Sequence, residues 1–110
     1  MTSTVRVLQP NGILDGSSAN DLSAEIVNHI QSGTKIVLLD FADVTFMNSS
    51  GIGALVSALK ITKKSGGNLY ICSPSFQIRD ILRITKLDKL FKVFTTREDF
   101  DQAVSATASS

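Results

Sequence analysis

The sequence predicts an α/β domain in which strands alternate with helices and most strands pair in parallel. Apolar and branched segments alternate along the chain with amphipathic segments of about a dozen residues, which is typical of this class. The run at residues 35–41 is largely apolar and rich in branched residues, as expected of a strand covered on both faces. We expect a mixed sheet of four to five strands packed with about four helices, all in one domain spanning residues 1–110.

The N-terminus predicts a hairpin. Residues 4–8 alternate polar and apolar side chains, which is the period of a half-buried strand. A turn signal follows at residues 10–12, and residues 13–15 have the length of a short returning strand. Parallel pairing is therefore expected only after these first two strands.

The first helix is expected after a break at residues 16–18. Ser18, followed three positions later by Asp21, resembles a capping box with Asp in place of the usual Glu or Gln. One apolar stripe recurs every four residues, at Leu22, Ile26 and Ile30. Gly33 ends the predicted helix.

The second half of the chain continues the alternation. A helix is predicted from about Ser50 to Ser65, and residues 68–72 form the next strand. Pro74 opens a third helix. A last strand at residues 90–94 and a last helix at 96–106 follow, and the small polar residues 105–110 are expected to form a disordered tail.

Composition excludes several classes of protein. Lys plus Arg total 11 and Asp plus Glu total 10, so the net charge of +1 gives no support to nucleic-acid or anionic-membrane binding. One cysteine, Cys72, and one histidine, His29, form neither an intramolecular disulfide nor a Cys/His zinc site. No apolar run approaches the ~20 residues that cross a bilayer. We expect a monomeric cytoplasmic protein with no cofactor and no metal.

Residues 48–53, Asn-Ser-Ser-Gly-Ile-Gly, lie where a predicted interior strand leads into the second helix. Asn and Ser side chains accept hydrogen bonds from unpaired amides of a first helical turn. Gly51 and Gly53 remove side chains from that turn, so that another group can approach the backbone. A helix N-terminus favours negative charge and would tolerate a phosphate. On local chemistry alone, a plain helix cap is the favoured interpretation.

Residues 39–53 resemble the signature of the STAS-domain anti-sigma factor antagonists, in which a strand and an aspartate-containing turn lead to Asp-Ser-[Ser/Thr]-Gly-[Leu/Ile]-Gly at a helix start. Residues 12–15, Gly-Ile-Leu-Asp, resemble the family's Gly-x-Leu-Asp before its first helix. Residues 66–69 resemble its Gly-Gly turn into the next strand, and residues 76–91 its final helix-to-strand segment. These pieces cover nearly the whole chain, and their order and spacing make the resemblance fairly specific.

The resemblance implies a STAS-type domain that acts as a partner switch and not as an enzyme. Unphosphorylated antagonists bind an anti-sigma factor that is also a serine kinase, which frees the sigma factor for transcription. The kinase phosphorylates the first serine of the pair, here Ser49, the complex dissociates, and a phosphatase resets it. The partner-binding surface is then expected to comprise Asp15, Asn48, Ser49, Ser50, Gly51 and Gly53.

Several of these residues have two interpretations. Ser50 is a second candidate for the phosphorylated serine. Asn48 stands where the family commonly has Asp, which keeps the cap but removes a charge. Asp15 either faces the partner or is only a turn or cap residue. Lysines on a helix more often form its solvated side than a partner contact. This applies to three lysines of the second helix: Lys60, Lys63 and Lys64.

An enzyme is not indicated. The nucleophile elbow Gly-x-Ser-x-Gly is absent around Ser49, and His29 is predicted on a helix away from the strand end. Asp99 and Asp101 are spaced by two, which points them apart on a helix. The alternative function is a ligand- or nucleotide-sensing or scaffold STAS module that regulates a non-sigma target, with its ligand in the crevice at the strand ends.

Overall fold

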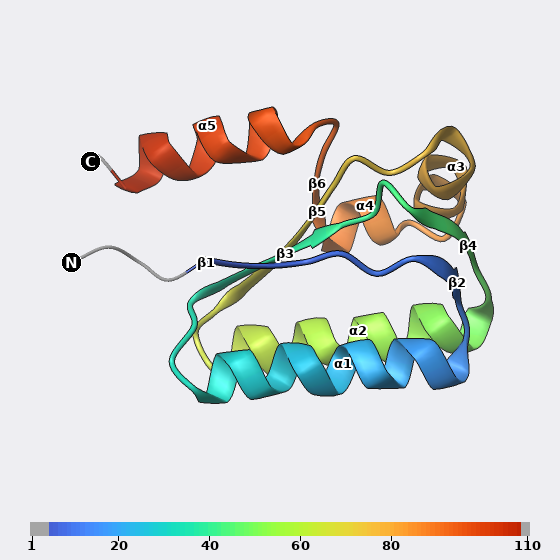
Figure 1. The fold of residues 1–110 in the computed structure, drawn as a ribbon, viewed down its shortest axis with the longest axis horizontal. Helices are drawn as coiled ribbons and strands as arrows, with labels where there is room; N and C mark the ends of the chain where they lie inside the picture. The colour runs from blue at the N-terminus through green and yellow to red at the C-terminus, as the bar shows by residue number, and fades with distance from the viewer. Residues whose placement is uncertain (1–4, 109–110) are drawn as a thin grey trace.

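The computed structural model describes residues 5–108 and shows a sheet with helices on both faces (Figure 1). Along the chain the elements are β1 (Val5–Leu8), β2 (Gly12–Leu14), α1 (Gly16–Gln31), β3 (Ile36–Asp40), β4 (Val44–Met47), α2 (Ser49–Lys64), β5 (Asn68–Cys72), α3 (Phe76–Ile84), α4 (Leu87–Leu90), β6 (Lys92–Phe94) and α5 (Arg97–Ala108). The predicted α/β class is confirmed.

Four strands form the main sheet in the order β1-β3-β5-β6, with every neighbouring pair parallel. β3 lies in the interior, and its residues 37–39 are fully buried. This agrees with the largely apolar sequence of this strand, because an interior strand of a parallel sheet is covered on both faces. β2 and β4 form a separate two-stranded parallel pair.

The predicted N-terminal hairpin is wrong, and the sheet is parallel where a mixed one was expected. β1 pairs with β3, whereas β2 pairs with β4. Gly12 explains the divergence: its positive φ of 71° redirects the chain, and its amide donates to the carbonyl oxygen of Asp43 at 2.9 Å. The turn residues therefore carry the chain from one sheet to the other instead of folding it back on itself.

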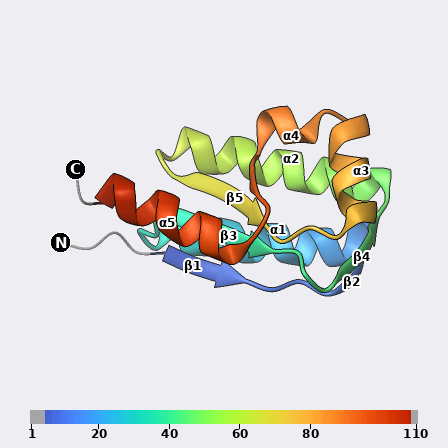
Figure 2. The same ribbon diagram turned by 90° about the horizontal axis from the view of Figure 1, so that it is seen from above.

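α1 and α2 lie side by side against one face of the sheet, and α5 covers part of the other face (Figure 1). Figure 2, viewed from above, shows α5 lying over the sheet between β1 and β5, roughly along the strand direction. The larger core fills the space between the sheet and the two long helices, and includes Ile26, Val37, Leu55 and Ile71. Beneath α5, Phe100 packs on Leu38 and Cys72. Cys72 is the last residue of β5 and is fully buried.

Several element boundaries differ from the prediction. The third helix, α3, begins at Phe76 and not at Pro74, because Ser75 is its N-cap. α1 begins at Gly16 and not after a break, because Asp15 is its N-cap. Residues 87–90 form the short helix α4, so β6 starts only at Lys92 and the helices number five among the described residues. The backbone of α5 is helical through Ala108. Of the predicted tail, residues 109–110 lie outside the described part of the chain.

Within residues 5–108, no helix combines the length and the apolar character that a membrane span requires.

Candidate functional site

Two helix N-termini meet at one end of the molecule. β2 and β4 run in parallel with Leu14 opposite Met47, and each strand leads directly into a capping residue and a long helix. Because the strands are paired and parallel, the caps Asp15 and Asn48 lie beside each other. Figure 1 shows α1 and α2 starting together at this end and running side by side away from it. The positive ends of both helix dipoles therefore face the same surface.

Asn48 caps α2. Its side-chain Oδ1 accepts a hydrogen bond from the amide of Gly51 at 2.9 Å, and its backbone is extended, with φ −95° and ψ 178°. Its own amide donates to the carbonyl oxygen of Leu14 at 3.2 Å, which ties the cap to β2. The amide side chain thus performs the capping role without adding a negative charge.

Ser49 and Ser50 are the first two residues of α2, and both are exposed. Within the described residues, neither hydroxyl forms a hydrogen bond. The two serines differ in their surroundings, because a Cβ built on Gly16 would lie 3.4 Å from the Cβ of Ser50. Ser50 therefore leans toward the start of α1, and Gly16 leaves the room for it.

The two glycines of this turn have different environments. Gly51 is buried, and a Cβ added to it would overlap the carbonyl oxygen of Leu14 and lie 2.8 Å from the carbonyl carbon. The group that approaches the backbone here is therefore the chain's own β2. Gly53 is exposed, and an added Cβ would meet nothing within 4 Å. Space for an outside partner exists at Gly53.

Asp15 forms a capping box with Ser18. The carboxylate of Asp15 accepts from the amide of Ser18 at 2.9 Å, and the amide of Asp15 donates to the hydroxyl of Ser18 at 3.0 Å. The predicted box between Ser18 and Asp21 is wrong by one turn, because Asp15 rather than Ser18 is the N-cap. The Ser18 amide, and then the Ser18 hydroxyl, stabilise the carboxylate and lower the pKa of Asp15 from its ordinary value of 3.8.

Replacing Asp15 with alanine is expected to lower Tm by several degrees at pH 7, because the first turn of α1 loses its cap. Asp15→Asn keeps a capping side chain but cannot titrate. A folded-state pKa below 3.8 means that the stability from ionised Asp15 is present above pH 3.8 and is lost as the pH falls further. Thermal melts of both variants at pH 7 and pH 3 test this. A gap between wild type and Asp15→Asn that is the same at both pH values would contradict it.

The remaining candidates lie away from this surface. Lys60, Lys63 and Lys64 are exposed on the last turns of α2, at least eleven residues from Ser49, or roughly 16 Å along the helix. His29 lies in the last turn of α1. Gly16 was not predictable as a residue of this site, because its role depends on Ser50 of the neighbouring helix. The signal available in the sequence was only its place directly after the Gly-x-Leu-Asp segment.

The comparisons with known proteins agree with this geometry. The STAS domain family model matches residues 2–100. The anti-sigma-B factor antagonist of Staphylococcus epidermidis is 35% identical over 82 residues, which cover 74% of this chain and 76% of that protein. The anti-sigma-B factor antagonist of Staphylococcus aureus is 30% identical over the same coverage of each chain.

Solved structures show the same architecture. A Thermotoga maritima protein assigned as an anti-sigma factor antagonist superposes with a TM-score of 0.84 at 25% identity, covering 96% of this chain and 91% of that one. The unphosphorylated form of SpoIIAA superposes with a TM-score of 0.78 at 21% identity, covering 96% and 92%, and shows the fold. The chain belongs to the STAS-domain family of anti-sigma factor antagonists.

Proposed function

We propose that this protein binds an anti-sigma factor with serine kinase activity, and that phosphorylation of Ser49 by that kinase releases it. A phosphatase then restores the binding form, so that transcription is controlled by exchange of partners. The observation that carries the proposal is the Ser49 hydroxyl: it is exposed, it has no hydrogen-bond partner among the described residues, and it stands at the first residue of α2. Family membership supports the general role of antagonising an anti-sigma factor.

A phosphate at Ser49 changes the surface without opposing the fold. It adds about −1.5 to −2 charges and three acceptor oxygens at pH 7. The amides and dipole at the start of α2 stabilise that charge. The neighbouring cap Asp15 already carries a carboxylate, so the surface becomes strongly anionic. A partner that docks on the neutral hydroxyl then faces electrostatic repulsion and the cost of desolvating the phosphate.

The proposed docking surface is built around the two caps. Asp15, Asn48 and Ser49 lie at the paired N-termini, and Ser50 stands beside them against α1. Gly53 offers open space one turn further along α2. Gly51 contributes indirectly. Because it has no side chain, the first turn of α2 can pack closely against β2, and this packing fixes the position of Ser49.

The protein is proposed to act by binding alone, since its family is generally non-enzymatic. We propose that it works in the cytoplasm as a monomer, without cofactor or metal, and without contacting nucleic acid or a membrane itself. Its balanced charge is consistent with a protein partner rather than a polyanion.

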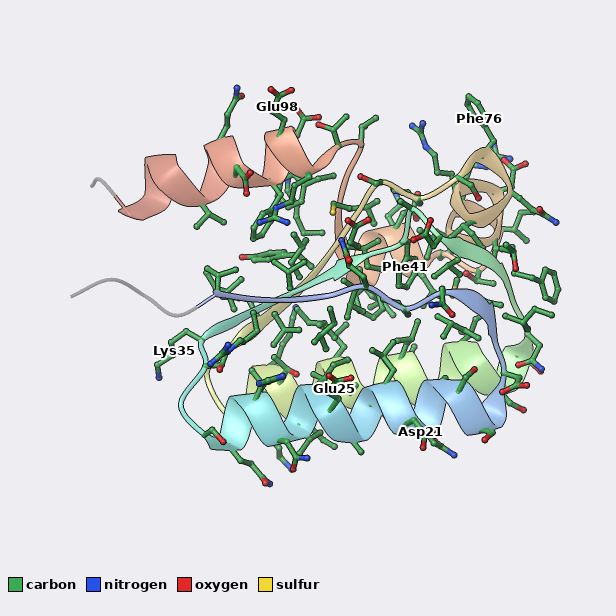
Figure 3. All side chains as sticks on the ribbon, in the orientation of Figure 1. Asp21, Glu25, Lys35, Phe41, Phe76 and Glu98 are labelled. Atoms are coloured by element: carbon green, nitrogen blue, oxygen red, sulfur yellow. The ribbon has the colours of Figure 1, made fainter. Side chains whose placement is uncertain are left out.

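The alternative, a nucleotide-sensing module, finds less support at this end of the molecule. A shallow hollow of about 250 Å³ beside the start of α1 is lined by Leu14 and Ser18, and also by the carboxylates Asp21 and Glu25. Figure 3 shows both carboxylates on α1. Phosphate groups would be repelled there. Lysines 63, 89 and 92 line another hollow of about 340 Å³, together with the carboxylate of Asp88. This hollow lies at the first residues of β5 and β6, whereas the alternative expects its ligand beyond the carboxyl ends of the strands.

Mapping the phosphate by mass spectrometry tests the proposal. After incubation with ATP and the anti-sigma factor kinase of the source organism, we expect one phosphate per chain, on Ser49. Ser49→Ala should remain unmodified, and Ser50→Ala should be modified as efficiently as the wild type. Phosphate confined to Ser50, or no phosphate on either serine, would count against the assignment.

A further inference from the structure

Two large apolar side chains are exposed side by side next to the proposed switch. Ile13 on β2 is 56% exposed and Phe46 on β4 is 43% exposed. These two residues are partners in the β2–β4 register, so their side chains stand on neighbouring strands at the same level. Cross-strand partners on one face of a sheet lie close enough to form a single contact surface.

Their exposure is imposed by the core. The next residue of each strand, Leu14 and Met47, is also a register pair, and both are buried, with 1% and 2% exposure. Successive side chains of a strand point to opposite faces. Burying Leu14 and Met47 therefore holds Ile13 and Phe46 on the outer face, and a register slip that hid them would expose the core pair.

Ile13 and Phe46 are close in sequence to the two helix caps and to the proposed phosphorylation site. Ile13 precedes the cap Asp15 by two residues, and Phe46 precedes the cap Asn48 by two. Ser49 is three residues from Phe46, so the Cα atoms of the two residues are at most about 10 Å apart. The apolar pair and the two helix caps thus form one continuous surface.

The other large exposed apolar residues lie in helices α2, α3 and α4 and are not cross-strand partners: Ile61, Phe76, Ile84 and Leu90. Ile61 lies in the later turns of α2, twelve residues and roughly 18 Å from Ser49. Phe76 is 84% exposed at the start of α3, and Figure 3 shows it projecting away from α1 and α2. Single exposed apolar side chains are ordinary on protein surfaces, whereas adjacent ones form a larger apolar patch, and such patches mark interaction sites.

We propose that Ile13 and Phe46 are the apolar anchor on which the anti-sigma factor docks, with Ser49 at the rim of the contact. The inference rests on the proposed function. The partner would present an apolar patch to this pair and no free cation to Ser49, since an arginine there would bind the phosphate instead of being repelled by it. Interfaces commonly place apolar side chains at the centre and polar groups at the rim.

Substitution by threonine tests the anchor, because threonine keeps the preference for a strand while removing apolar surface. Phe46→Thr and Ile13→Thr are each expected to weaken binding of the unmodified protein to the purified anti-sigma factor kinase at least tenfold. Phe76→Thr and Ile61→Thr make the same chemical changes elsewhere and should stay within twofold of the wild type. Phe46→Leu should recover most of the affinity, because it restores an apolar contact.

Melting curves separate docking from folding. The pair also stabilises the β2–β4 ladder to some extent, so Tm is measured for every variant at the same pH. Wild-type affinity in Phe46→Thr and Ile13→Thr, or an affinity loss that is no larger than in the two control variants, would overturn the anchor.

The two proposals fail in different ways. If the wild type binds the kinase and loses that binding on phosphorylation, while the threonine variants bind normally, the anchor is wrong and the switch stands. If the unmodified wild type binds none of the purified anti-sigma factor kinases of the source organism, the proposed function is wrong, and the proposed role of Ile13 and Phe46 is wrong as well.

Discussion

Replacing Gly51 with alanine is expected to lower the free energy of unfolding by about 3 kcal/mol, at the upper end of the usual cost of overpacking. The added methyl group would overlap the carbonyl oxygen of Leu14, which is backbone and cannot rotate away. Relief requires β2 and the start of α2 to separate, and that movement strains the hydrogen bond from the Asn48 amide to Leu14. Urea unfolding followed by circular dichroism measures the change.

Gly53→Ala is the matched control, two residues along the same helix. Its added methyl group meets nothing within 4 Å, and alanine favours a helix over glycine. The variant is expected to gain about 0.5–1 kcal/mol of stability. A similar loss of stability in both variants would show that the close approach of Leu14 to Gly51 is not the cause of the destabilisation in Gly51→Ala.

Ser49→Asp is expected to weaken binding to the anti-sigma factor kinase about a hundredfold, which corresponds to ~2.7 kcal/mol. A carboxylate at the first residue of α2 is favourable for the helix but places a second negative charge beside Asp15 within the docking surface. Ser49→Ala should bind within about threefold of the wild type and should not be released by ATP. Titration calorimetry gives both affinities.

Ser50→Ala controls for the second hydroxyl. Ser50 packs toward Gly16 at the edge of the docking surface, so removal of its hydroxyl should weaken binding far less than Ser49→Asp and should leave the release by ATP intact. Loss of ATP-dependent release in Ser50→Ala, together with normal release in Ser49→Ala, would show that Ser50 and not Ser49 is the phosphorylated residue.

The fold was largely predictable where local pattern decides it. The branched apolar run of β3 indicated an interior strand, and the Asn-Ser-Ser-Gly segment indicated the start of α2 to within one residue. Pairing of β1 and β2 was not predictable in this way, because a Pro-Asn-Gly turn suits a hairpin equally well. In the structure β1 pairs with β3 instead of with β2. The amide of Gly12 donates to the carbonyl oxygen of Asp43, which directs β2 toward β4.

The residues of the site were predictable from the sequence, but the contacts between them were not. The signature around Ser49 indicated which residues belong to it, whereas the contact of Gly51 with Leu14 and that of Ser50 with Gly16 depend on the pairing of β2 with β4. The capping box was misplaced because Ser18 suits both the N-cap and the third position of the helix. Its hydroxyl in fact donates to the carbonyl oxygen of Ile13, five residues earlier, at 2.8 Å.

Calorimetric titration of the anti-sigma factor kinase with protein phosphorylated on Ser49, beside unmodified protein from the same preparation, tests the central claim most directly. We predict at least a hundredfold weaker binding of the phosphorylated form, with circular dichroism spectra that superimpose. Equal affinities for the two forms would contradict the account, since the charge at the start of α2 would then have no influence on docking.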